Sequence, residues 1–352
     1  MGLRLRSALT AAVLACAAAC GGSSPAAPSP GPSTQVPSPG GPVPPPGTHI
    51  LTGAIVNALD DSGAGAASFT VNGTLLGSSQ ASGAFSVGFP ASGSNPLTLA
   101  ANGFVTRETS VTAPAANLRL SLIPASFDLP SFDQMFRHSS GNRLTRWKQP
   151  PAIMIERRTL QFNTTSSDTV TALDETMSGA EVDALVADLL LGYSLLTADR
   201  LGPITSVASR EAAPGAAVGV RTPGTIVITR QRGLTASQNF WGYARWSLTA
   251  DGEVTGGVII LDADFEKSNS PFRRSLRMHE LGHTLGCQHV SLPVRSVMNS
   301  NAVTEPNDFD RAAARLAMLR QPGNRSPDID PASLSATTAA RTPRAVTWYG
   351  AH

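Results

Sequence analysis

One stretch near the carboxyl end limits the fold more than any other. Residues 279–289 read His-Glu-Leu-Gly-His-Thr-Leu-Gly-Cys-Gln-His. On a helix, His279 and His283 are one turn apart on the same face, so both ring nitrogens can reach one Zn²⁺ at about 2.0–2.1 Å. Gly286 can adopt a positive φ, end the helix and let the chain turn back, which brings His289 in as a third ligand. Three protein ligands leave a fourth position for water, as in catalytic zinc sites.

Glu280 directly follows the first of these histidines. A glutamate at this place can take a proton from a metal-bound water without binding the metal itself. The competing interpretation is a buried helix with hydrogen-bonded histidines, but three histidines and a glutamate would then need separate partners in a core. The motif therefore predicts one zinc site with Glu280 as the general base.

This motif resembles that of the metzincin zinc metallopeptidases. The run Ser-Val-Met-Asn at 296–299 lies where metzincins place a methionine turn beneath the zinc, and the resemblance implies that role for Met298. It implies an α+β peptidase domain over residues 144–320, with a twisted, mostly parallel sheet, long helices, a zinc helix and this turn. The order of the expected elements is closest to that of matrixins, so the implied activity is that of a zinc-dependent endopeptidase.

The chain departs from the matrixin pattern in three respects. No cysteine remains upstream of the motif once the export signal is processed, so latency through a prodomain cysteine is unsupported. The other histidines, at positions 49, 138 and 352, do not suggest a second, structural zinc. Ser300 stands where some metzincins have a tyrosine ligand, two residues after the methionine.

Residues 1–20 have the pattern of an export signal, with two arginines before an apolar run too short to span a bilayer. Cys20, followed by Gly-Gly-Ser-Ser, resembles the processing site of a bacterial lipoprotein; Cys16 is a competing site, and an ordinary cleaved signal is the alternative. Residues 21–48 are rich in Pro, Gly and Ser and predict an extended spacer. We therefore expect an exported lipoprotein at the outer membrane or cell surface, anchored to the membrane through Cys20, or otherwise a secreted protein.

Composition limits the partners. The chain has 27 basic and 25 acidic residues, and removal of the two arginines of the signal leaves 25 of each, so no basic surface indicates nucleic acid. We expect a monomer that acts on proteins or peptides. Cys287 is the only cysteine outside the signal, so no intrachain disulfide is expected, and its side chain is expected to pack rather than bind metal.

Residues 49–124 are expected to form an all-β sandwich. Apolar residues alternate in short runs, and the Asn-Gly pairs at 72–73 and 102–103 predict hairpins. The runs at 83–87 and 100–104 are similar to those of carboxypeptidase-regulatory-like domains, and this resemblance implies a stalk or adhesion module. Residues 125–143 are expected to be a connector.

Within residues 144–320, Ser178 and Glu181 predict a capping box for an amphipathic helix that closes at Gly192. Strands are expected at 152–156, 204–209, 225–230, 243–249 and 256–262, and the metzincin resemblance makes the last one the edge that lines the cleft. The dipeptide Ser270-Pro271 predicts the start of the zinc helix, and residues 306–319 predict a closing helix. Residues 321–352 are expected to be disordered.

Two further interpretations stay open. An acidic group could bind calcium, although a solvated acidic loop is the competing interpretation; it consists of Asp262, Asp264 and Glu266. The alternative function is that of a surface adhesin or polysaccharide-associated lipoprotein that retains the metal fold, against which the presence of Glu280 argues.

Overall fold

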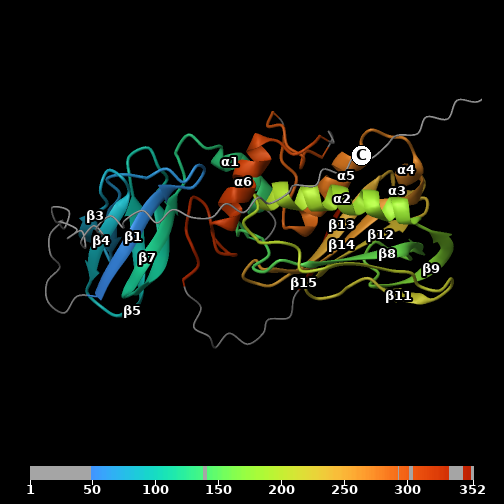
Figure 1. The fold of residues 1–352 in the computed structure, drawn as a ribbon, viewed down its shortest axis with the longest axis horizontal. Coiled ribbons are helices and arrows are strands. Elements are labelled where there is room, and N and C mark those ends of the chain that lie inside the picture. Colours follow the sequence, from blue (N-terminus) through green and yellow to red (C-terminus); the bar gives the residue numbers. More distant parts are fainter. Residues whose placement is uncertain (1–48, 138–140, 292, 301–303, 333–343, 350–352) are drawn as a thin grey trace, which may run out of the picture. The chain divides into compact units, whose positions relative to one another are not determined.

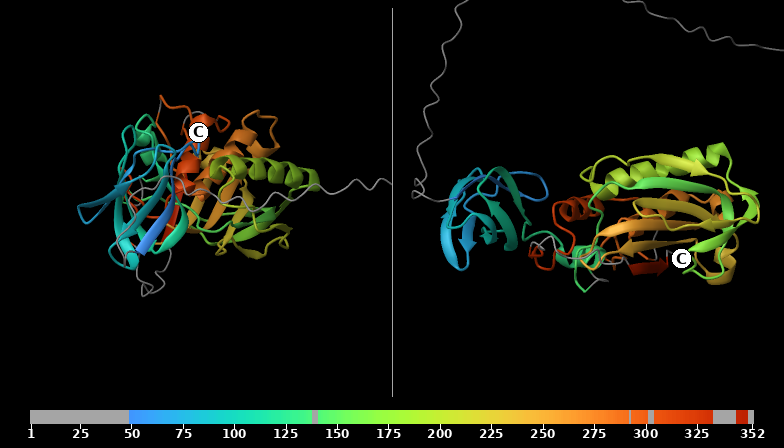
Figure 2. Two further views of the ribbon diagram at one scale, coloured as in Figure 1. Left: turned by 60° about the vertical axis from the view of Figure 1, so that its left-hand side comes forward. Right: turned by 90° about the horizontal axis from the view of Figure 1, so that it is seen from below.

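The computed structural model describes residues 49–137, 141–291, 293–300, 304–332 and 344–349, which belong to one compact unit. The expected export signal, the processing sites at Cys16 and Cys20, and the spacer lie outside the described residues. The described chain is a mixed α+β structure in which strands dominate (Figures 1 and 2).

The amino-terminal part consists of two small sheets. One has the strand order β4-β1-β7 and comprises β1 (His49–Asn57), β4 (Ala84–Phe89) and β7 (Ala115–Leu122). The other has the order β3-β2-β5-β6 and comprises β2 (Ser68–Val71), β3 (Thr74–Ser78), β5 (Gly93–Ala100) and β6 (Arg107–Ala113). Apolar side chains from both sheets share one buried cluster, as in a sandwich. Asn72 and Gly73 both have positive φ in the β2–β3 turn, as the Asn-Gly pair predicts.

A larger sheet follows, with the order β11-β9-β8-β12-β14-β13-β15, and β10 also pairs with β8. Its strands are β8 (Ala152–Gln161), β9 (Thr169–Thr176), β10 (Val207–Arg210), β11 (Ala217–Gly219), β12 (Thr225–Gln231), β13 (Gly242–Leu248), β14 (Val254–Asp262) and β15 (Arg344–Tyr349). The pairs β10–β8, β8–β12 and β12–β14 are parallel, whereas the flanking pairs are antiparallel. The sheet is therefore parallel only in its centre, not mostly parallel.

The helices are α1 (Leu129–Phe136), α2 (Gly179–Thr197), α3 (Leu234–Gln238), α4 (Ala263–Lys267), α5 (Arg273–Thr284) and α6 (Asp308–Met318). Helix α2 packs on α5 and α6, and α5 packs on β13 and β14, so one face of the sheet is covered by helices (Figure 1). Alternate residues of β12 belong to two cores, with Ile226 and Ile228 on the helical side and Val227 on the other.

The capping box of α2 is present, because Ser178 accepts from the Glu181 amide and Glu181 accepts from the Ser178 amide. The expected end at Gly192 is wrong, since α2 continues to Thr197. Gly192 instead lies where α2 crosses α5: a Cβ there would be 2.9 Å from Cγ of Met278. The glycine serves close helix packing, not termination.

Three other expectations about element positions are corrected. Strand β14 is not an edge, because β13 pairs along its outer side. Helix α5 begins at Arg273, with Phe272 as the N-cap residue and no side-chain cap, two residues later than Ser270-Pro271 predicts. The expected connector contains α1, whose amino end is capped by the Asp128 side chain.

The segment after α6 is not disordered over residues 321–332. Buried Arg320 forms an ion pair with buried Asp328, and Arg107 of the amino-terminal part pairs with Asp330 at 2.7 Å. Buried guanidinium groups require counter-charges, and this polar segment supplies them. Asn324 donates to both carboxylates, which ties the segment together.

Candidate metal centre

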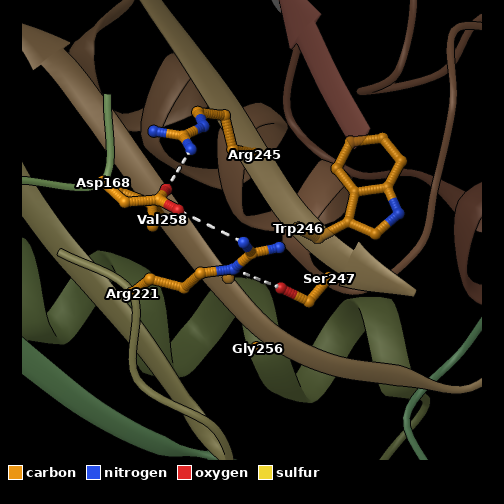
Figure 3. Close-up of a pocket in the computed structure, with 8 residues that line it drawn as sticks. Asp168, Arg221, Arg245, Trp246, Ser247, Gly256 and Val258 are labelled. Carbon is orange, nitrogen blue, oxygen red and sulfur yellow. Dashed lines mark hydrogen bonds and ion pairs between the residues drawn. The ribbon is translucent and has the colours of Figure 1, made fainter. Parts of the chain in front are cut away.

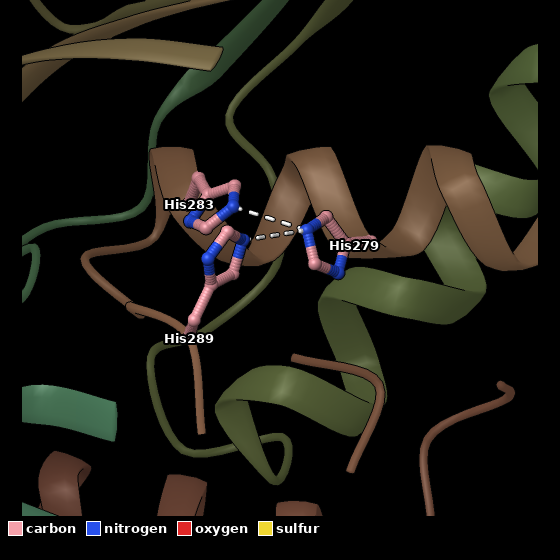
Figure 4. A group of neighbouring side chains, drawn as sticks. All are labelled: His279, His283 and His289. Atoms are coloured by element: carbon pink, nitrogen blue, oxygen red, sulfur yellow. Dashed lines mark hydrogen bonds between the residues drawn. The ribbon is translucent and has the colours of Figure 1, made fainter. Parts of the chain in front are cut away.

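The structure brings the three predicted histidines together at the carboxyl end of α5 (Figure 4). His279 and His283 project from one face of the helix, and His289 approaches from the loop that follows. The Nε2 atom of His279 lies 3.1 Å from Nε2 of His283 and 3.3 Å from Nε2 of His289. Two nitrogens bound tetrahedrally to one zinc at about 2.0–2.1 Å lie about 3.3 Å apart, so the spacing fits this ion.

The second ring nitrogens show why a cation fits between these rings. Nδ1 of His279 lies 2.6 Å from the carbonyl of Val297, and Nδ1 of His283 lies 2.9 Å from the carbonyl of Cys287. A carbonyl only accepts, so each Nδ1 must carry the hydrogen, and each Nε2 of a neutral ring then has a lone pair. Two lone pairs that face each other at 3.1 Å repel unless a cation or a proton lies between them.

Burial favours the neutral form of both helix histidines. It lowers the pKa of His279 to about 3, with the nearby His289 adding to the effect. It also holds the pKa of His283 well below the ordinary value, with both other histidines contributing. Neutral imidazole is the form that binds metal, so the rings are available as ligands at neutral pH.

Glu280 is fully buried, and neither of its carboxyl oxygens has a hydrogen-bonding partner among the described residues. Burial raises the pKa of this group well above its ordinary value. A Cβ at Gly242 of β13 would lie 3.2 Å from Oε1 of Glu280, so the carboxyl group of this α5 residue packs closely against β13. A buried carboxyl group without a partner is expected where a bound group or water completes the site.

Gly286 has φ 104°, and α5 ends at Thr284, as the motif predicts. A Cβ at Gly286 would lie 2.5 Å from the carbonyl oxygen of Thr145, whose hydroxyl group donates to the Gly286 carbonyl at 2.6 Å. Both the conformation and the close approach therefore require glycine here. Cys287 is buried as a free thiol with its pKa raised by burial, in line with a packed side chain.

Met298 is fully buried beneath α5. A Cβ at Gly282 would lie only 2.4 Å from Sδ of Met298, so the small residue between the two histidines lets the methionine pack against the helix. The carbonyl that holds His279 belongs to the preceding residue, Val297. The turn at 296–299 thus positions a histidine through its backbone.

Asp310 of α6 fixes this turn, a role that the sequence did not indicate. Its carboxylate accepts from the hydroxyl group of Ser296 at 2.5 Å and from the amide of Val297 at 3.0 Å. It also accepts from the amide of Asn307, with which it forms the capping box of α6. The Asn-x-x-Asp pattern at 307–310 could have indicated the cap, but not the link to His279 through Val297.

Strand β13 borders the site, which no pattern in the sequence predicted. The Trp246 ring is parallel to the His283 ring, with 6.1 Å between the centroids. The neighbouring Arg245 and Ser247 point to the opposite face of the sheet, where Asp168 bridges Arg245 and Arg221 (Figure 3). The face of β13 that carries Arg245 thus contributes to an ion-pair cluster, and the face that carries Trp246 lies toward the histidines.

The acidic residues considered for calcium do not converge. Asp262 caps α4 by accepting from the amides of Asp264 and Phe265, and Glu266 forms an ion pair with Arg277. Within the described part of the chain, the only group of three or more His, Cys, Asp or Glu ligand atoms close enough to hold one metal is the histidine triad. The structure gives calcium no site at these residues.

Comparison with family models and with curated proteins found no match for this chain. None of the helices in the described ranges is both long and apolar enough to cross a membrane.

Proposed function

We propose that this chain is a zinc-dependent endopeptidase of the metzincin type, closest to matrixins, that hydrolyses proteins outside the cytoplasm. The observation that carries the proposal is the convergence of three histidine Nε2 atoms, with Glu280, the residue after the first histidine, fully buried and without a hydrogen-bonding partner among the described residues. A purely structural site would have no use for that carboxyl group.

His279, His283 and His289 would hold one Zn²⁺. When bound, the ion polarises the scissile carbonyl and lowers the pKa of water toward about 7. Glu280 accepts the proton of the attacking water and delivers it to the leaving amine. Gly242 leaves room for this carboxyl group, and an extended peptide would pair with the outer edge of β13, the edge that β15 pairs with in this structure.

The test compares the full chain with two matched variants. Glu280→Gln keeps the size of the side chain but cannot act as the base, so we expect casein hydrolysis to fall at least about 100-fold. Zinc content by elemental analysis should stay near one ion per chain, and the melting temperature should be close to that of the wild type. Glu108→Gln, at an exposed residue of β6, is the control and should change none of these quantities. Chelation should abolish hydrolysis by the wild type.

Two outcomes would contradict the proposal. If Glu280→Gln cleaves casein at the wild-type rate, the carboxyl group is not the base, and the adhesin with a retained metal fold becomes the better explanation. If His283→Ala keeps its full zinc content, the three histidines are not the ligands.

We also propose that the mature protein carries lipid on Cys20 and acts as a monomer at the outer membrane or cell surface. The support is the sequence pattern alone: a short apolar run, a cysteine and a spacer with ten prolines in residues 21–47. Mass spectrometry of the mature amino terminus tests the anchor. An unacylated terminus beyond residue 20 would reject the anchor and leave secretion.

A further inference from the structure

The last described strand, β15, pairs with the outer edge of β13. The pairing is antiparallel and runs over all six residues of β15, from Tyr349 opposite Tyr243 to Arg344 opposite Leu248. Without β15, β13 would be the last strand of the sheet, with one edge open. Every residue of β13 is buried in this arrangement.

The covered strand is the one that borders the metal centre. Gly242, at its first position, approaches the Glu280 carboxyl group, and Trp246 is parallel to the His283 ring. An extended peptide with its scissile bond at the histidines would run beside β13 and need the same backbone N–H and C=O groups. One edge can pair with only one strand at a time.

We propose that the segment Arg344–Tyr349 is an intramolecular inhibitor that occupies the strand-pairing edge required by a peptide substrate. This inference rests on the proposed peptidase function. Because inhibitor and site belong to one chain, the local concentration of the segment is on the order of mM for a short connection. A substrate peptide of similar affinity must compete with that concentration, so release of β15 should raise kcat/KM about tenfold or more.

The decisive variant is Val346→Pro/Thr347→Pro in the full chain. Successive amides of a strand point to opposite sides, so one of two adjacent prolines must remove a donor that faces β13. The matched control is Val346→Ala/Thr347→Ala, which keeps both amides. We expect kcat/KM for casein hydrolysis to rise about tenfold or more in the proline variant and to change much less in the alanine variant.

Two measurements support the comparison. Amide hydrogen exchange over β13 should become faster in the proline variant than in the wild type, while exchange in β12 stays the same. A synthetic peptide with the sequence of residues 344–349 should inhibit the proline variant competitively, raising KM without lowering kcat.

The outcomes separate the two proposals. If the proline variant exchanges faster over β13 but cleaves no faster than the wild type, β15 is a structural cover of the edge and the inhibitory role is overturned. If exchange over β13 does not change, the pairing itself is refuted. If neither protein cleaves casein at any rate, the peptidase function fails, and exchange and peptide binding still decide the pairing.

Discussion

Gly286→Ala tests whether the turn after α5 builds the site. At φ 104°, an alanine is strained by about 1–3 kcal/mol. Its Cβ would lie 2.5 Å from the carbonyl oxygen and 2.9 Å from the carbonyl carbon of Thr145, and such overpacking adds about 1–3 kcal/mol. The lower entropy of the unfolded alanine chain offsets less than about 1 kcal/mol of this cost. The net loss of unfolding free energy is therefore about 1–6 kcal/mol.

Gly215→Ala is the matched control. This glycine also has a positive φ, 78°, but a Cβ there meets nothing within 4 Å, so only strain of about 1–2 kcal/mol remains. Urea unfolding of the metal-free proteins measures the loss of unfolding free energy in each variant. Zinc titration then shows whether Gly286→Ala, and not Gly215→Ala, weakens binding through a displaced His289. Equal losses of unfolding free energy and unchanged zinc affinity in both variants would refute the role of the Gly286 turn in placing His289.

Two further predictions concern residues that surround the site, and a third concerns the segment after α6. Met298→Leu should keep its zinc and most of its activity and lose less than about 1.5 kcal/mol, measured by urea unfolding, because the swap conserves volume. Asp310→Asn should lose about 1.5–3 kcal/mol and bind zinc more weakly in a competition titration, because an amide cannot accept from all the donors that hold the turn carrying Val297. Burial is the largest single influence on the pKa of Asp330 and raises it, but the charge and hydrogen bonds of Arg107, a hydrogen bond from Asn324 and the charge of Arg320 together bring the folded-state pKa below its ordinary value of 3.8. The carboxylate therefore stabilises the fold above about pH 3.8 and this contribution is lost as the pH falls further, so Asp330→Asn should flatten the acid limb of the stability curve.

The residues of the candidate site could be predicted because their chemistry is local in sequence. His279 and His283 need only a helix, and Gly286 needs only a positive φ to return the chain toward them. The partners that orient these groups could not be predicted. Val297, Asp310 and Thr145 act through distances between separate elements, for which a single sequence contains no pattern.

Elements of the fold that depend on hydrophobic periodicity and helix caps could be predicted from the sequence. Elements that depend on tertiary contacts could not. The Ser178 cap begins α2 as predicted, but Gly192 does not end it, because packing on Met278 determines the residue type there. The order of strands β13 and β14 in the sheet depends on pairing rather than on hydropathy. Residues 321–332 have the composition of a tail, and only the buried charges of Arg107 and Arg320 reveal why they are ordered.

Under the proposed function, the pairing of β13 with β15 bears on how the peptidase could be kept inactive. An inhibitory cysteine would have to reach the metal, and the only cysteine beyond the first 20 residues is Cys287, which is buried in the motif itself. An inhibitor that pairs with β13 through its backbone needs no such ligand and leaves the histidines untouched. Pairing through the backbone also requires no particular side chains, so a six-residue segment can act as such an inhibitor without a recognisable sequence motif. Under the proposed function, the proline pair rather than the alanine pair should therefore release the activity.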